Sequence, residues 1–265
     1  MKINKKILSK IYLSLLMFFF YLPILYTIAF SFNSTKSLTR FQGFSLRWYA
    51  DIFQNRTMMN AVWYTFVIAI IATVISTIIG TITAIGLSKS KKIISNVVLQ
   101  VNNLPIMNPE IVTAVGLLML FASIPMIEKG FITLLLAHIM FCIPYVILSV
   151  MPKLRTLDPN LIEAAMDLGA TPTQSLIKVI VPQIMPGIIA GALIAFTMSF
   201  DDFVISYFVT GNGVNNISIL VYTMVRRINP SINALSTIII IIITAALIIM
   251  NIIPMLKEKK EKQRI

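Results

Sequence analysis

The sequence predicts an all-α integral membrane protein with six transmembrane helices. Hydrophobic residues make up 57% of the 265-residue chain and charged residues only 12%, whereas a soluble domain carries about 25% charged residues. Crossing a bilayer takes roughly 17–25 mostly apolar residues. Six stretches are long enough, and they fill most of the chain, leaving no room for a soluble catalytic domain: residues 11–32, 62–87, 105–124, 131–151, 184–209 and 234–254.

The first apolar stretch is interpreted as a retained helix. It is too long for the apolar core of a signal peptide, and no small-residue cleavage site follows it. The predicted organisation is therefore an N-terminal segment over residues 1–10, a six-span domain over 11–256 and a basic tail over 257–265. The single cysteine, Cys142, lies in the fourth stretch, where it is expected to be an inert core residue.

The net charge of +12 is divided unevenly between the two sides of this topology. The positive-inside rule places the more basic side in the cytoplasm, with both termini and residues 152–182, and leaves residues 33–60 outside. The tail then serves as a topology anchor near anionic lipid, not as a nucleic-acid site. Fifteen basic residues lie on the cytoplasmic side: Lys2, Lys5, Lys6, Lys10, Lys89, Lys91, Lys92, Lys153, Arg155, Lys178, Lys257, Lys259, Lys260, Lys262 and Arg264. Seven lie on the other: Lys36, Arg40, Arg47, Arg56, Lys129, Arg226 and Arg227.

Residues 33–60 form the longest external loop. It contains SLRWYADIF, in which Trp48 and Tyr49 predict a short helix anchored at the membrane interface. The alternative is that this segment forms part of a docking surface for an external protein.

The third apolar stretch begins with a helix-start signal at Asn108-Pro109-Glu110. Asn can cap a helix, Pro suits the first helical position, and Glu offsets the positive end of the helix dipole. The helix is therefore expected to restart at Asn108, with residues 91–104 as a separate helix. Glu110 is either a dipole partner or a residue lining a path. His138, in the fourth stretch, is expected to be a hydrogen-bonded structural histidine, and no residue spacing indicates a metal site.

Between the fourth and fifth stretches lies a polar loop that predicts helix, turn, helix. Asp158 followed by proline can start a helix over residues 159–168. Gly169 can end this helix in a left-handed conformation. Thr171 and Gln174 complete a capping box for the second helix.

One face of the first helix in this loop carries small and apolar residues. Leu161, Ala164, Ala165 and Leu168 recur at helical spacing. Such a rigid, capped hairpin is a poor design for a linker, and it suits insertion into a groove on a partner protein.

The same loop resembles the EAA loop of ABC-importer permeases. The matching residues are Glu163-Ala164-Ala165, Gly169 and Pro182. The resemblance implies a MetI-like type I importer fold over roughly residues 60–255. It also implies a second homologous permease, two cytoplasmic ATPases that each grip one coupling helix, an external substrate-binding protein, and a place in a bacterial cell membrane.

Two further segments are similar to the second permease subunit of spermidine/putrescine transporters. They are SFDDFVIS, Ser199 to Ser206, and FQGFSLRWYADIF, Phe41 to Phe53. This finer resemblance implies a polyamine substrate. A permease for another solute, such as an anion, iron or a phosphonate, remains the alternative.

Three intramembrane acids are candidates for the substrate pathway: Glu110, Asp201 and Asp202. An acid at this depth costs on the order of 2.5–3.5 kcal/mol by insertion scales, so it usually faces a cavity or a partner. Adjacent aspartates on one helix point about 100° apart. We therefore expect one to face the pathway and the other to cap or to pair with Arg226 or Arg227; the alternative is that both are structural.

The acids would also fit an ion-coupled secondary transporter, but such a carrier needs no ATPase-binding loop. The chain has no GxxxxGK[ST] phosphate loop. It is therefore predicted to be no enzyme and to hold no cofactor, with ATP and Mg²⁺ bound by the partner ATPase.

Overall fold

The computed structural model describes residues 5–211, 213–224 and 230–262. Within these ranges the regular structure is helical, apart from one isolated β-bridge between Asn33 and Phe44. The helices form two compact units. The terminal unit consists of the described residues up to Met59 and from Val221 onward, and the central unit runs from Asn60 to Leu220.

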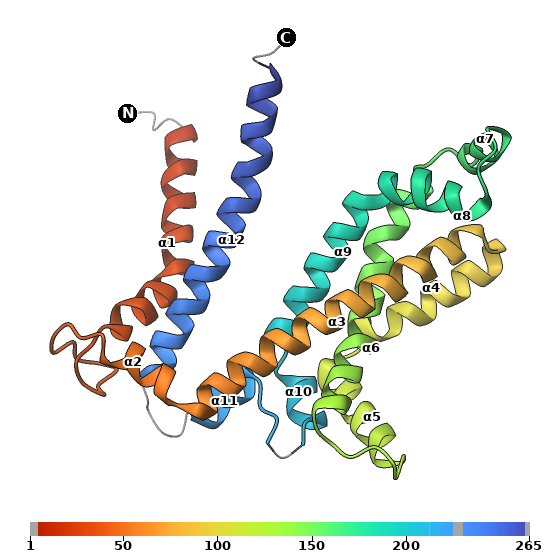
Figure 1. The fold of residues 1–265 in the computed structure, drawn as a ribbon. Coiled ribbons are helices and arrows are strands. Elements are labelled where there is room, and N and C mark those ends of the chain that lie inside the picture. Colours follow the sequence, from red (N-terminus) through yellow and green to blue (C-terminus); the bar gives the residue numbers. More distant parts are fainter. Residues whose placement is uncertain (1–4, 212, 225–229, 263–265) are drawn as a thin grey trace. The chain divides into compact units, whose positions relative to one another are not determined.

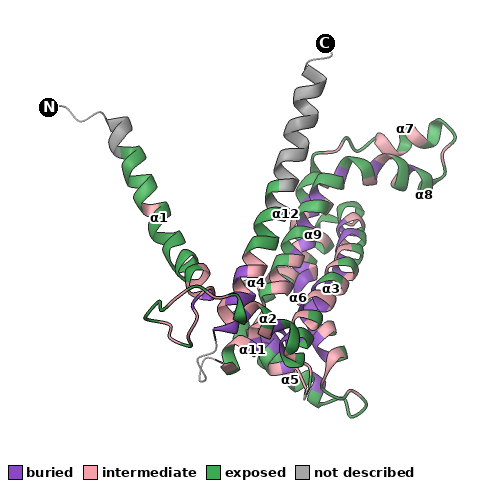
Figure 2. Ribbon diagram, turned by 60° about the vertical axis from the view of Figure 1, so that its left-hand side comes forward, coloured by how far each residue is buried: buried purple, intermediate pink, exposed green. Residues whose placement is uncertain are grey.

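The terminal unit contains α1 (Lys5–Ser31), α2 (Arg47–Gln54) and α12 (Ser231–Lys262). Helix α12 packs against both α1 and α2. In Figure 1 the start of α1 and the end of α12 both lie at the end of this unit opposite α2. Most of α1 is exposed within the chain, as its green colour in Figure 2 shows.

The loop between α1 and α2 is held together by Asn33 and Trp48. The Trp48 indole N–H donates to the Asn33 carbonyl at 2.6 Å, and the Asn33 side chain donates to the carbonyls of Ser37 and Arg40. The short helix predicted here is confirmed as α2. Trp48 is only 2% exposed, so it fixes the loop from within the protein, and its place at the membrane interface stays a prediction.

The central unit is organised around α6 (Phe131–Arg155), which packs against α9 (Val181–Asp201). The buried face of α9 carries Gly187, Gly191, Ala195 and Ser199, one residue per helical turn. These small residues let the two backbones approach closely. A β-carbon on Gly191 would lie 3.2 Å from the Cα of Val146.

The other elements of the central unit surround this pair (Figure 1). They are α3 (Arg56–Lys89), α4 (Lys92–Met107), α5 (Glu110–Ala122), α7 (Leu161–Asp167), α8 (Pro172–Ser175), the π-helical segment η1 (Leu176–Ile180), α10 (Val204–Val209) and the first residues of α11 (Ile217–Met224). Ser88 and Lys89, at the end of α3, line a cavity of about 340 Å³ together with Asp158, Pro159 and Ile162. The end of α3 therefore lies beside the start of the α7–α8 hairpin.

Four described helical segments are long and apolar enough to cross a membrane: Ser9–Ser31, Arg56–Lys89, Phe131–Arg155 and Pro172–Asp201. The count is five if the bent pair α4 and α5 forms one span. The described apolar part of α12, Ser231–Ala245, is shorter. An all-helical membrane fold is confirmed, and the exact number of six spans stays a prediction.

Two predicted spans differ from the structure. Residues 105–124 are not one straight helix, because α4 continues to Met107 and the chain then bends by 105° into α5. The 13 residues of α5 cover only about 20 Å. Residues 184–209 are not continuous either, since α9 ends at Asp201 and α10 begins at Val204.

Candidate functional site

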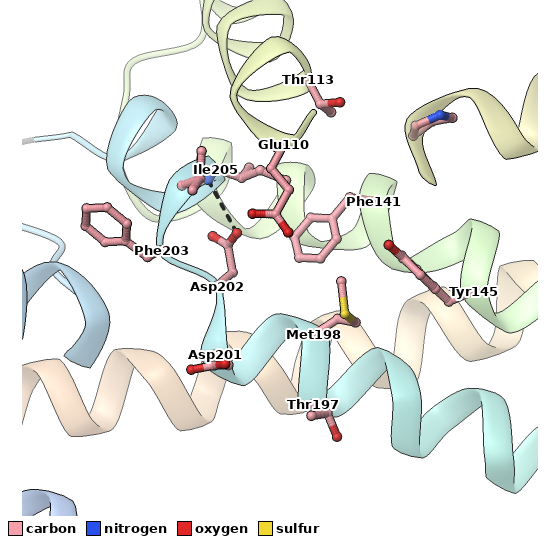
Figure 3. Close-up of a pocket in the computed structure, with 12 residues that line it drawn as sticks. Glu110, Thr113, Phe141, Tyr145, Thr197, Met198, Asp201, Asp202, Phe203 and Ile205 are labelled. Atoms are coloured by element: carbon pink, nitrogen blue, oxygen red, sulfur yellow. Dashed lines mark hydrogen bonds between the residues drawn. The ribbon is translucent and has the colours of Figure 1, made fainter. Parts of the chain in front are cut away.

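The three predicted pathway acids meet at one cavity in the central unit. Glu110, at the start of α5, and Asp201 and Asp202, at the end of α9, all line a space of about 260 Å³ (Figure 3). Phe141, Tyr145 and Phe203 also line it. We call this space the acidic cavity. It combines carboxylates with aromatic rings, whose faces attract organic cations.

Asp202 shapes the break between α9 and α10. Its backbone is extended, with ψ of 128°, and its carboxylate accepts hydrogen bonds from the N–H groups of Ile205 at 3.3 Å and Ser206 at 2.7 Å. These N–H groups belong to the first turn of α10, where no carbonyl of the helix can accept them. Asp202 therefore caps α10.

Asp201 differs from its neighbour in exposure. Asp201 is exposed, whereas the Asp202 side chain is only 6% exposed. In Figure 3 the Glu110 and Asp202 carboxylates point into the same space, and the Asp201 side chain points the opposite way. The two aspartates differ because the helix breaks after Asp201; they were wrongly expected to lie on one continuous helix.

In the described part of the chain, no Lys or Arg forms an ion pair with these three acids. The predicted partners Arg226 and Arg227 lie outside the described residues. The cavity thus presents negative charge without a basic side chain among its lining residues.

His138 lies in a buried hydrogen-bonded cluster next to the cavity. Its Nδ1 is 2.7 Å from Ser199 Oγ and its Nε2 is 2.9 Å from Ser206 Oγ. The side chain is 1% exposed. The prediction that His138 is hydrogen-bonded is confirmed.

A second candidate site is the α7–α8 hairpin. Gly169 has a φ of +88°, the left-handed conformation predicted for it. The Gly169 N–H donates to the Met166 carbonyl at 2.8 Å, and the Ala170 N–H donates to the Ala165 carbonyl at 3.1 Å. This pair of bonds is the Schellman arrangement that ends a helix.

The second half of the hairpin also follows the prediction. The Gln174 N–H donates to Thr171 Oγ1, and the Thr171 N–H donates to Gln174 Oε1, which completes the capping box. The first helix is shorter than expected, because α7 begins at Leu161 and not at residue 159. The Asp158 carboxylate instead accepts the Asn160 N–H in the turn before it.

The four small and apolar residues at helical spacing in this segment differ in exposure. Leu161 and Ala165 are half-buried and Leu161 packs on the core, whereas Ala164 and Leu168 point outward. Leu168 is 90% exposed. The hairpin therefore presents Glu163, Ala164 and Leu168 on a free outer surface within this chain.

Pro182 lies inside a continuous helical segment, Pro172–Asp201. Proline lacks the N–H that an α-helix needs at this position. The chain accommodates it by the π-helical segment η1 directly before it, in which Val181 N–H donates to the Leu176 carbonyl. Pro182 is thus accommodated by a local widening of the helix.

Some features of the site were missed from sequence. The aromatic lining by Phe141, Tyr145 and Phe203 was not predicted, although Phe203 directly follows the two aspartates. The small-residue stripe on α9 was also missed, although Gly187 and Gly191 form a GxxxG pattern in an apolar stretch.

Comparisons with known proteins give consistent matches over most of the chain. Residues 76–256 match the family described as binding-protein-dependent transport system inner membrane component. The putrescine transport system permease protein PotI of Escherichia coli (strain K12) is 40% identical over 254 residues, covering 93% of this chain and 89% of PotI. The spermidine/putrescine transport system permease protein PotC of the same strain is 36% identical over 229 residues, covering 84% and 85%.

Similarity of fold extends to solved structures. A chain of a bacterial ABC transporter involved in the import of the acidic polysaccharide alginate superposes with a TM-score of 0.72 at 15% identity, covering 92% of this chain and 94% of that one. The same type of transporter in complex with an alginate pentasaccharide-bound periplasmic protein gives a TM-score of 0.68 at 15% identity, covering 92% and 91%.

Proposed function

The chain belongs to the family of binding-protein-dependent transport system inner membrane components, and we propose that it forms half of the translocation pathway of a polyamine importer. A second homologous permease supplies the other half, and an external binding protein delivers the polyamine. Two separate ATPase subunits bind ATP and Mg²⁺, since this chain has no phosphate-binding loop. The relatives PotI and PotC carry names that include putrescine and spermidine.

The observation that supports this substrate class is the acidic cavity. Glu110, Asp201 and Asp202 line one space, and Phe141 and Tyr145 supply aromatic faces beside them. A polyamine carries several ammonium groups joined by apolar carbon chains. Carboxylates compensate the charge, and aromatic rings contact both the ammonium groups and the carbon chain.

The same lining disfavours the alternative substrates. An anion or a phosphonate would meet carboxylates with no lysine or arginine among the lining residues. An ion-coupled carrier has less support, because the family to which the chain belongs is binding-protein-dependent.

We assign different roles to the two aspartates. Asp202 already accepts two backbone N–H groups and caps α10. The Asp201 side chain has no hydrogen bond or ion pair to a described residue, and Asp201 is exposed. Glu110 therefore compensates an ammonium group inside the cavity and Asp201 compensates one at its exposed edge, whereas Asp202 holds the shape of the cavity wall.

The hairpin is the proposed contact with the ATPase. Ala164 leaves room for the close approach of another surface, and Leu168 offers an apolar side chain that is 90% exposed within this chain. The Schellman turn at Gly169 and the capping box at Thr171 make the hairpin rigid. Rigidity lets the hairpin transmit motion between the ATPase and α9, with which the second half of the hairpin is continuous.

The proposed orientation follows the charges. The end of α3, with Lys89, lies beside the start of the hairpin, and Arg155, just before the hairpin, lines the same cavity. The positive-inside rule then puts this end of the central unit, and both termini, in the cytoplasm. The chain is a multi-pass subunit of the bacterial inner membrane, with residues 33–60 outside and in reach of the binding protein.

The test is uptake by the whole complex in proteoliposomes, with Glu110→Gln and Asp201→Asn made separately. Each variant keeps the size of the side chain and removes its charge. We expect putrescine or spermidine uptake to fall about tenfold or more, which corresponds to about 1.4 kcal/mol. Glu128→Gln is the matched control, because Glu128 is an exposed acid that does not line the cavity. Normal uptake by both cavity variants would remove the charge role.

A further inference from the structure

His138 connects three helices at the wall of the acidic cavity. It lies on α6, and its two ring nitrogens contact Ser199 on α9 and Ser206 on α10 at 2.7 and 2.9 Å. The break between α9 and α10 lies between these two serines. One buried side chain therefore holds both sides of the helix break.

The polar groups at the break are satisfied by side chains from distant parts of the sequence. The Asp202 carbonyl accepts the Asn216 amide at 3.0 Å, and Asn216 also donates to Ser206 Oγ at 2.9 Å. Buried backbone groups that lack a helical partner need such bonds. Ser206 thus joins His138, Asn216 and the N–H···carboxylate bond of Asp202 in one cluster.

The cluster also fixes the opposite wall of the cavity. Helix α10 packs extensively against α5, and α5 begins with Glu110. A shift of α10 would therefore move Glu110 relative to Asp201, which ends α9. The distance between the two proposed cation-binding carboxylates depends on how α9 and α10 are joined.

We propose that His138 is a positioning residue for transport: by bonding to Ser199 and Ser206 together, it sets the separation of Glu110 and Asp201. This inference rests on the proposed function of the acidic cavity. His138 itself does not line the cavity, so it acts through the two helices and through Asp202, whose carboxylate lies 3.6 Å from its Nε2, and not by contact with the substrate.

The first experiment compares His138→Phe with Cys142→Ala in the reconstituted complex. Phenylalanine keeps a ring and removes both hydrogen bonds, together with the contact between His138 Nε2 and the Asp202 carboxylate. Cys142 is the matched control, because it lies one turn further along α6, is equally buried, and bonds only to α9, through the Ala195 carbonyl at 3.4 Å. We expect His138→Phe to reduce polyamine uptake per assembled complex at least fivefold, and Cys142→Ala to leave uptake within twofold of the parent. Normal uptake by His138→Phe overturns the inference.

A double-mutant cycle separates positioning from general destabilisation. If His138 acts through the placement of the carboxylates, adding His138→Phe to Asp201→Asn should lower uptake little further. A purely structural role predicts that the two losses multiply, and that result overturns the inference. His138→Gln, whose amide can bond to one serine, should restore part of the uptake.

If His138→Phe fails to assemble, Ser199→Ala decides the question. This change releases His138 from α9 and keeps its contact with Ser206. Reduced uptake at normal assembly supports the inference, and normal uptake overturns it. The proposed function has a separate test: it is wrong if Glu110→Gln and Asp201→Asn both transport normally. The positioning role alone is wrong if these two variants lose uptake and His138→Phe keeps it.

Discussion

Gly169→Val is expected to uncouple transport from ATP hydrolysis, because Gly169 turns the chain between α7 and α8. Its φ is +88°, a conformation that costs an L-amino acid roughly 1–2 kcal/mol. No atom lies within 4 Å of the position that a β-carbon would take. The whole cost is therefore backbone strain, and no steric clash adds to it.

This cost corresponds to a factor of about 5–30 in the population of the native turn. We expect uptake per assembled complex to fall within that range. The assay is polyamine uptake and ATP hydrolysis measured together in proteoliposomes. Gly169→Asn is the control, because asparagine tolerates positive φ better than most residues, and it should stay close to the parent. If Gly169→Val shows normal uptake with a normal ratio of substrate to ATP, the hairpin is not the coupling element.

Two other predictions test packing and topology. Gly191→Leu should destabilise the α6–α9 contact by about 1–3 kcal/mol and lower the Tm of the purified complex. Gly116→Leu is the control and should leave the Tm unchanged, because no atom lies within 4 Å of the added β-carbon. Equal Tm values for the two variants would contradict the close packing of α6 and α9. In a Cys142→Ala background, an impermeant thiol reagent added outside intact cells should label Lys36→Cys and leave Asn160→Cys unlabelled. Labelling of position 160 would reverse the proposed orientation.

The hairpin was predicted almost completely from sequence because its determinants are local. Gly169 ends a helix and Thr171 starts the next through bonds to residues within five positions. The restart near Asn108 was predicted for the same reason, and α5 begins at Glu110. The bend of 105° between α4 and α5 was not predicted. A junction that contains proline indicates that a helix breaks, but it does not give the angle of the break.

The break at Asp202 could not be read from local sequence. No proline or glycine lies between Ser199 and Ser206, and the apolar pattern continues across the segment. The break depends on His138 and Asn216, which are 61 residues from Ser199 and 14 residues from Asp202 respectively. The placing of Glu110 and Asp201 at one cavity has the same origin, because it requires the packing of α5 against α10.

The most direct test of the proposal is substrate-dependent uptake by the complete complex. The chain is reconstituted with its partner permease and ATPases, and binding proteins loaded with putrescine, spermidine, sulfate or an amino acid are added outside. The account predicts ATP-dependent accumulation of putrescine or spermidine, and loss of that accumulation when Glu110→Gln and Asp201→Asn are combined. Accumulation of sulfate or the amino acid without either polyamine would contradict it.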